Sequence, residues 1–220
     1  MTSASTTQWL NHLQRSRAIA VIRSDQVNQG VAMATAAAAG GIRLIEITWN
    51  SDRPAHLIAH LRSHLPHCLI GAGTLLTVAA VQEAVAAGAQ FLFTPHTSPS
   101  LIQVAQAMEV PLVAGALSPT EIVTAWQAGA ACVKVFPIQV VGGVAYLRAL
   151  QGPLGHIPLI PTGGVTIANA RDLIAAGAIA VGLSGELFPK GAIAQQDWGC
   201  ITQRAQQLQA ALTPTMPHRG

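Results

Sequence analysis

Two charged side chains stand in segments whose other residues are typical of a buried strand. Glu46 lies in the run LIEIT at positions 44–48, and Lys134 lies in the run CVKVF at positions 132–136. Successive side chains of a strand point to opposite faces, so both charges face away from their β-branched neighbours and toward the interior of a barrel. Ten of the 12 basic residues are arginine, so a lysine in the middle of a strand needs an explanation.

A buried glutamate and a buried lysine are compatible with two interpretations. They could form a structural ion pair, because an unpaired interior charge is strongly destabilising. They could instead be catalytic, because a desolvated lysine amine can lose its proton and attack a ketone while a nearby carboxylate carries protons. Buried ionisable groups gather at functional sites, so we favour the catalytic interpretation for Lys134 and Glu46.

Glycine-rich sequences at the ends of two later strands predict an anion site. They are PTGG at positions 161–164 and GLSG at positions 182–185. Glycines let backbone N–H groups approach an anion, and a following helix N-terminus adds a favourable dipole. Each pair of glycines could be an ordinary turn, but phosphate often binds at the loops after strands seven and eight of a barrel. Their joint position favours phosphate.

Three further residues at strand ends are candidates for the site. Thr74 ends the sequence GAGT at 71–74 and could offer a hydroxyl to a substrate, or it could cap the next helix. Arg23 ends the first expected strand, and its planar fork could hold a carboxylate or phosphate or join a surface ion pair. His96 could line the mouth of the pocket or simply occupy a loop.

Four histidines lie on or just after one expected helix: His56, His60, His64 and His67. Spacing of four residues can bind a metal on one helical face. Each of the first three histidines precedes a leucine, and these leucines form the stripe that should face the core. The histidines are then left toward solvent with no carboxylate beside them, so we expect no metal site.

The elements that must position these residues alternate regularly. The expected strands are Ala18–Arg23, Arg43–Thr48, Cys68–Ala72, Phe91–Thr94, Pro111–Gly115, Cys132–Phe136, Ile157–Ile160 and Ala180–Leu183. The expected helices are Val27–Ala39, Pro54–Leu65, Thr77–Ala87, Pro99–Glu109, Pro119–Ala128, Gly143–Leu150, Ile167–Ala176 and Ile193–Leu212. This alternation predicts right-handed βαβ units on a parallel sheet.

Eight such units in 220 residues predict an α/β fold, a (β/α)8 TIM barrel. No GxGxxG sequence follows the first strand, where an open dinucleotide-binding sheet would place it. We expect one domain over residues 1–220, with a polar N-terminal segment at 1–17 and a flexible tail at 213–220.

Composition argues against several other classes of protein. The chain is 50% hydrophobic and only 10% charged, which argues against disorder. The net charge of +3 comes with no basic cluster, so we expect no nucleic-acid partner. The uncharged stretch at 84–108 is interrupted by glycine and prolines, so we expect no membrane span. The polar start is unlike a signal peptide, and three scattered cysteines suit a reduced, cytoplasmic protein.

Taken together, four motifs resemble those of the KDPG/KHG aldolase family. These class I aldolases act on 2-keto-3-deoxy-6-phosphogluconate and 4-hydroxy-2-oxoglutarate. The motifs are EIT at 46–48, GAGT at 71–74, VKVFP at 133–137 and PTGG at 161–164. They follow the family's order, and the resemblance spans about residues 18–189.

The resemblance implies a mechanism and a set of partners. Lys134 would form a Schiff base with the C2 ketone, and Glu46 would move protons while the C3–C4 bond breaks. The products would be pyruvate and glyceraldehyde 3-phosphate, with no metal or other cofactor. The residues implied to bind substrate are Thr74 and Phe136 at the pyruvyl group, and Thr162, Gly163, Gly164 and Ser184 at the phosphate. The resemblance also implies a homotrimer.

One position departs from the gluconate-type pattern. Many of those members carry an arginine four residues after the glutamate, where it holds the pyruvate carboxylate, but this chain has Asn50. An Asn-Ser pair resembles the branch acting on 2-keto-3-deoxy-6-phosphogalactonate, in which an arginine ending the first strand binds substrate. Arg23 occupies that place, so we expect both Arg23 and Asn50 at the substrate.

The leading hypothesis is therefore a Schiff-base lyase that cleaves 2-keto-3-deoxy-6-phosphogluconate or its galactonate epimer. One alternative is action on unphosphorylated 4-hydroxy-2-oxoglutarate or oxaloacetate. Another is a phosphosugar-binding barrel without catalysis, in which Glu46 and Lys134 form a buried strut. A metal-dependent aldolase using the helix histidines is the weakest of the alternatives.

Overall fold

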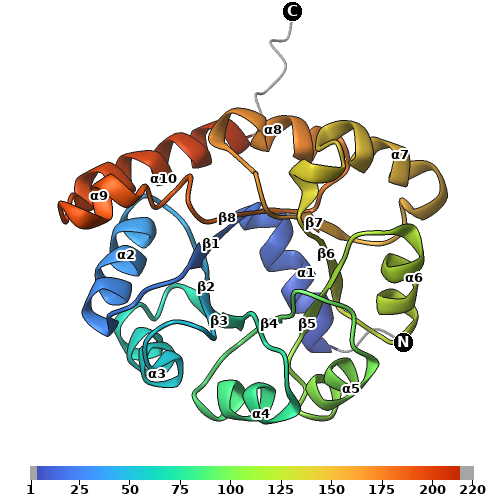
Figure 1. The fold of residues 1–220 in the computed structure, drawn as a ribbon, viewed down its shortest axis with the longest axis horizontal. Helices are drawn as coiled ribbons and strands as arrows, with labels where there is room; N and C mark the ends of the chain where they lie inside the picture. Colours follow the sequence, from blue (N-terminus) through green and yellow to red (C-terminus); the bar gives the residue numbers. More distant parts are fainter. Residues whose placement is uncertain (1–3, 214–220) are drawn as a thin grey trace, which may run out of the picture.

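Eight parallel strands close around one axis in the computed structural model, which describes residues 4–213 (Figure 1). The strands are β1 (Ala18–Ile22), β2 (Leu44–Thr48), β3 (Leu69–Gly73), β4 (Leu92–Phe93), β5 (Leu112–Ala116), β6 (Cys132–Val135), β7 (Leu159–Pro161) and β8 (Val181–Leu183). Neighbours follow sequence order, and β1 also pairs with β8. A bridge between Thr162 and Gly182 joins β7 to β8 and completes the ring. The predicted single-domain barrel is confirmed; most of the expected tail lies outside the described residues.

Helices surround the ring of strands. They are α2 (Val27–Ala39), α3 (Pro54–His64), α4 (Val78–Ala86), α5 (Pro99–Ala107), α6 (Pro119–Gln127), α7 (Val144–Leu154), α8 (Ile167–Ala175), α9 (Lys190–Ala194) and α10 (Trp198–Leu212), with a short 3-10 turn at Ile138–Val141. Side-chain caps begin several of them. For example, Ser118 and Glu121 form a capping box at α6, because each side chain bonds the other's backbone N–H.

Two of the predicted helices differ from the structure by more than two residues. The single helix expected over Ile193–Leu212 is wrong, because α9 ends at Ala194 and α10 begins at Trp198. Gln196 adopts a left-handed conformation with φ 52°, and the Asp197 carboxylate accepts a hydrogen bond from Cys200 N. Asp197 is thus a helix cap rather than an interior residue. The helix expected to end at Leu150 instead continues to Leu154.

The side chains of the strands form two separate cores. Ile45, Ile47, Val133 and Val135 pack outward against the helices. A second core fills the barrel itself, and its members include Leu44, Phe91, Phe93, Val113, Cys132 and Ile160. The period-two alternation predicted for β2 and β6 is therefore confirmed.

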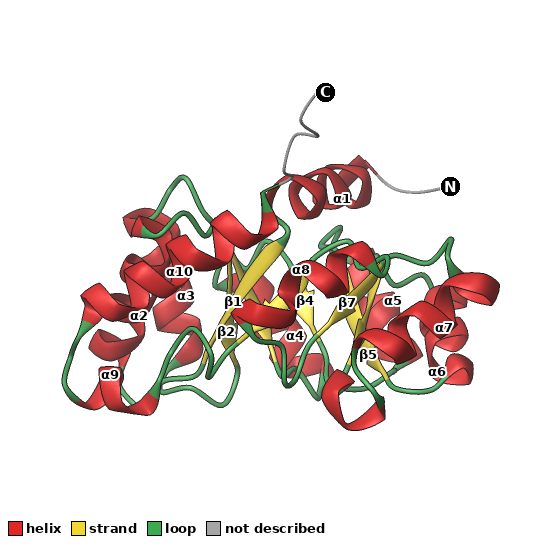
Figure 2. Cartoon of the chain, turned by 90° about the horizontal axis from the view of Figure 1, so that it is seen from above, coloured by secondary structure: helices red, strands yellow, loops and turns green. Residues whose placement is uncertain are grey.

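The N-terminal segment forms helix α1 (Ala4–Ser16), which lies across the end of the barrel where the strands begin (Figure 2). Trp9 and Leu13 of α1 belong to the inner core. The Trp9 ring stacks on Phe91 at a centroid distance of 4.7 Å and meets the edge of Phe93 at 6.5 Å. Aromatic packing thus closes the end of the barrel where the strands begin. We call this end the lower end, although it lies at the top of Figure 2, and the end where the strands finish the upper end. Within residues 4–213, no helix is both long and apolar enough to cross a membrane.

Candidate active site

Glu46 and Lys134 lie inside the barrel, as their strand positions predict. The relative exposure of Glu46 is 1% and that of Lys134 is 6%. The Lys134 Nζ atom lies 4.9 Å from the centroid of the Phe136 ring and 5.7 Å from that of Phe93. Across the described chain Glu46 and Lys134 form no ion pair. This geometry does not favour the buried strut, which requires the two groups to be in contact.

The Glu46 carboxyl has a raised pKa. Burial is the main cause, because it disfavours the charged form, and the positive charges of Lys134 and Arg23 oppose the shift. Its Oε1 atom is buried and has no hydrogen-bond partner among the described residues. An unpartnered buried oxygen is destabilising, and such groups call for a functional explanation. A carboxyl with a raised pKa can both accept and return a proton near neutral pH.

Gly73 makes the space that the Glu46 side chain occupies. A Cβ atom at Gly73 would lie 1.7 Å from Glu46 Oε1, and one at Gly71 would lie 2.3 Å from the Phe91 ring. Both glycines therefore admit neighbouring side chains into the interior of the barrel.

Thr74 sits at the end of β3 in a conformation that threonine rarely adopts. Its φ is +60°, in the left-handed region. The alternative role as a helix cap is wrong, because Thr77 caps α4 by accepting a hydrogen bond from Ala80 N at 3.1 Å. A strained residue is maintained where the surrounding structure or a function requires it, which supports Thr74 as a site residue.

The two glycine-rich loops lie side by side at the upper end of the barrel. Gly163 and Gly164 both have φ +84°, which favours glycine. Thr162 is buried and forms the bridge to Gly182, which brings the loop after β7 next to Ser184 at the end of β8. Ser184 is exposed, and its carbonyl accepts hydrogen bonds from Leu187 N and Phe188 N. The two loops are therefore close enough to bind the same anion.

Arg23 and Asn50 meet at the same end of the barrel. Arg23 Nε donates a hydrogen bond to Asn50 Oδ1 at 3.2 Å, and both side chains are exposed. In the part of the chain that the structure describes, Arg23 belongs to no ion pair. The alternative role of Arg23 in a surface ion pair is therefore not what the structure shows.

The histidines lie away from this site. His56, His60 and His64 are exposed on α3, and the rings of His60 and His64 stack at 5.5 Å. Among residues 4–213, no three His, Cys, Asp or Glu side chains gather as a metal site would require. His96 is exposed in the loop after β4.

Phe93 was not predicted as a site residue, yet the centroid of its ring lies 5.7 Å from the Lys134 Nζ atom. It is 1% exposed and points inward from β4, two positions after Phe91. The alternation Phe-Leu-Phe at 91–93 carries this signal, because period two places both rings on one face.

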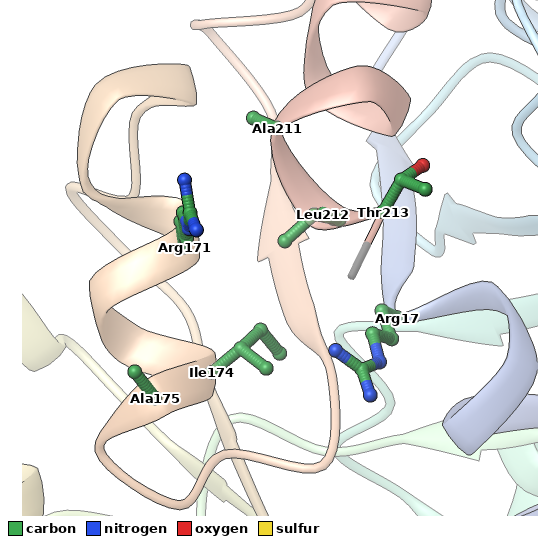
Figure 3. Close-up of a pocket in the computed structure, with 7 residues that line it drawn as sticks. All are labelled: Arg17, Arg171, Ile174, Ala175, Ala211, Leu212 and Thr213. Atoms are coloured by element: carbon green, nitrogen blue, oxygen red, sulfur yellow. The ribbon is translucent and has the colours of Figure 1, made fainter. Parts of the chain in front are cut away.

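A separate hollow lies between the residue before β1 and the last turns of α8 and α10 (Figure 3). It has a volume of about 220 Å³ and is lined by Arg17, Arg171, Ile174, Ala175, Ala211, Leu212 and Thr213. None of the predicted site residues contributes to it. Convergence of Glu46, Lys134 and the two loops, rather than the presence of a hollow, therefore locates the candidate site.

Comparisons with known proteins agree on one family. The family model described as KDPG and KHG aldolase matches residues 10–204. The 2-dehydro-3-deoxy-phosphogluconate aldolase of Treponema pallidum is 35% identical over 89% of this chain and 93% of its own. The KDPG aldolase of Legionella pneumophila, solved with pyruvate captured as a covalent carbinolamine intermediate, is 29% identical with a TM-score of 0.83, covering 89% and 95%. A native KDPGal structure is 30% identical with a TM-score of 0.81, covering 88% and 93%.

Proposed function

The chain belongs to the KDPG and KHG aldolase family, and from that premise we propose that it cleaves a phosphorylated 2-keto-3-deoxy sugar acid through a Schiff base on Lys134. The observation that carries the proposal is the placement of Glu46 and Lys134 inside the upper barrel, without an ion pair between them. The Legionella structure with its covalent pyruvate intermediate supports the same chemistry.

Lys134 acts first. Its Nζ attacks the C2 ketone of the substrate and forms a carbinolamine, which loses water to become an iminium ion. The aromatic faces of Phe136 and Phe93 lie near Nζ and favour the positive charge of that ion. The iminium nitrogen then draws electrons from the C3–C4 bond.

Glu46 acts as the general base and general acid in the same reaction. Its carboxylate takes the proton of the C4 hydroxyl as the C3–C4 bond breaks, which releases glyceraldehyde 3-phosphate and leaves an enamine on Lys134. The protonated carboxyl then returns a proton to C3, and hydrolysis frees pyruvate. One group serves in both directions because burial raises its pKa above that of an ordinary glutamate, so that it keeps an accepted proton long enough to return it.

The two ends of the substrate need separate partners. The loops after β7 and β8 provide glycine backbone at Gly163 and Gly164 and the Ser184 hydroxyl for the phosphate. Arg23 provides a cation for the carboxylate, which Asn50 cannot supply. Thr74 contacts the pyruvyl group from the end of β3.

The galactonate epimer is a second candidate substrate. Asn50 stands where gluconate-type members carry arginine, and it is bonded to Arg23 at the end of β1. A similar solved structure is named KDPGal, which supports this choice. Both epimers give the same products.

Pyruvate release coupled to lactate dehydrogenase tests the proposal. We expect kcat/KM to be highest for one of the two phosphorylated epimers, and lower by about 10²-fold or more for unphosphorylated 4-hydroxy-2-oxoglutarate, because binding of the remote phosphate contributes to the transition state. Equal or higher kcat/KM for 4-hydroxy-2-oxoglutarate would replace the proposed substrate. Binding of both epimers without any pyruvate release would favour a phosphosugar-binding barrel.

The expected homotrimer is a separate proposal. Among the residues that the structure describes, four large apolar side chains are more than a third exposed, namely Leu76, Val78, Phe136 and Val140. Contact between copies would cover part of this apolar surface. Light scattering should give three times the 22.8 kDa mass of one chain, and a mass of one chain would contradict it.

A further inference from the structure

The segments that follow β1 and β2 run beside each other and are joined at two levels. At the exposed level, Arg23 Nε donates to Asn50 Oδ1 at 3.2 Å. At the buried level, the next residue of each segment takes part, because Ser24 N donates to Ser51 Oγ at 3.2 Å. The backbone adds a third link, from Asp52 N to Ser24 O at 2.8 Å.

Ser51 connects this junction to the strand that carries Glu46. The Ser51 hydroxyl also shares a hydrogen bond with Thr48 Oγ1 at 3.2 Å. Thr48 is 1% exposed and lies two positions after Glu46 on the same face of β2. One hydroxyl therefore joins the loop that carries Arg23 to the strand that carries the general base.

The two levels differ in how firmly they can hold Arg23. A single hydrogen bond between exposed side chains is weak, because water competes for both partners and the arginine loses rotamer freedom. Ser51 is 8% exposed and Ser24 is 2% exposed. Loss of the Ser51 hydroxyl would leave a buried N–H without its acceptor, which is more costly than loss of an exposed bond.

We propose that Ser51 is a positioning residue, whose buried hydroxyl fixes the loop after β1 so that the Arg23 guanidinium is held ready for the substrate's carboxylate. This inference rests on the proposed function. Asn50 occupies only Nε of the guanidinium, and within residues 4–213 no hydrogen bond is made by the two terminal nitrogens. A guanidinium fixed in place can bind a carboxylate with less loss of entropy than a mobile one.

The test uses Ser51→Ala and measures two quantities for each protein. The first is the pyruvate concentration that half-saturates borohydride trapping on Lys134. The second is the pair kcat and KM for the better phosphorylated epimer. We expect both the half-saturating pyruvate concentration and KM to rise about tenfold, as for the loss of one buried hydrogen bond, with kcat changed less than about threefold.

Two other variants separate positioning from a general loss of packing. Ser51→Cys fills the same space but offers a weak acceptor, so it should show a defect in the same direction. Thr97→Ala is the matched control. Thr97 Oγ1 also joins the loop after β4 to a neighbouring element, by donating to Gly115 O of β5 at 2.9 Å, and within residues 4–213 no hydrogen bond links it to Arg23 or Asn50. It should leave pyruvate saturation unchanged.

A double-mutant cycle with Arg23→Ala tests whether Ser51→Ala weakens pyruvate binding through Arg23. If Ser51 acts through Arg23, adding Ser51→Ala to Arg23→Ala should raise the half-saturating concentration no further. Wild-type saturation in Ser51→Ala, or a full additional effect in the double variant, would overturn the inference while leaving the aldolase intact. A wild-type protein that neither traps pyruvate nor releases it would instead overturn the proposed function and this inference with it.

A phosphate contact of Arg23 gives a different pattern. Pyruvate carries a carboxylate and no phosphate. If Arg23 binds the phosphate, Ser51→Ala would raise KM for the phosphorylated epimer while pyruvate saturation stayed at the wild-type value, and the carboxylate assignment would be wrong.

Discussion

The two ends of the barrel interior are built from opposite kinds of residue. The lower end holds Trp9, Phe91 and Phe93 in contact with one another and closed by α1. The upper end holds Glu46 and Lys134 with glycines and hydroxyls at the strand ends. Aromatic burial stabilises the fold, whereas an unpartnered carboxyl oxygen destabilises it. Stability and chemistry are therefore assigned to different layers of the same eight strands, and Phe93 lies where the two layers meet.

The largest expected effect on activity is at the upper end. Lys134→Ala removes the nucleophile, so kcat should fall by more than about 10⁴-fold. The free energy of unfolding should not fall in proportion, because the variant also removes a buried amine. Pyruvate release measures kcat, and urea unfolding measures the free energy of unfolding. Retained turnover in Lys134→Ala would show that the upper layer does not supply the nucleophile.

Glu46→Gln should have the next largest effect. The amide cannot exchange the proton, so kcat should fall by about 10²–10⁴-fold, as for loss of a general acid–base. The imine should still form on Lys134. Borohydride trapping in the presence of pyruvate should therefore remain positive while turnover is slow, and loss of trapping would show that Glu46 acts earlier than proposed.

The raised pKa of Glu46 also predicts a pH dependence. Cleavage needs the carboxylate, so kcat/KM should fall as pH drops through a value above that of an ordinary glutamate, and Glu46→Gln should lack this limb. The sign for stability is the reverse. Burial disfavours the charged form, so the folded wild type should lose stability relative to Glu46→Gln as pH rises through the same value. Urea unfolding across that pH range checks the second statement.

At the lower end, Trp9 should affect stability and leave activity almost unchanged. Trp9→Ala removes a 2%-exposed indole from the inner core and should lower the free energy of unfolding by about 3–5 kcal/mol. At temperatures where the variant stays folded, kcat should stay within about threefold of wild type, since Trp9 packs on Phe91 and Phe93 at the end of the barrel closed by α1. A large fall in kcat with intact folding would show that Trp9 contributes to the chemistry.

The smallest change in free energy is expected at the phosphate loop. Ser184→Ala should raise KM for the phosphorylated substrate by about tenfold or somewhat more, as for one hydrogen bond to a charged group. Steady-state kinetics on unphosphorylated 4-hydroxy-2-oxoglutarate provide the control, because that substrate has no phosphate to lose. Equal effects on both substrates would remove Ser184 from the phosphate site.

The sequence predicted features that depend on local periodicity. Alternation alone placed Glu46 and Lys134 on the inner face, because the side-chain period of a strand is two. The helix break at Gln196 was missed, because glutamine is a good helix former and is not typical of the left-handed conformation that it adopts there. The bond between Ser24 and Ser51 was also missed, because it joins residues 27 apart and depends on how β1 and β2 are aligned.

Borohydride reduction in the presence of pyruvate, followed by mass mapping, tests the central claim most directly. The chain supplies its own control, since Lys190 is an exposed lysine and Lys134 a buried one. The account predicts a reduced pyruvyl adduct on Lys134 and none on Lys190. An unmodified Lys134, or equal labelling of both lysines, would contradict it.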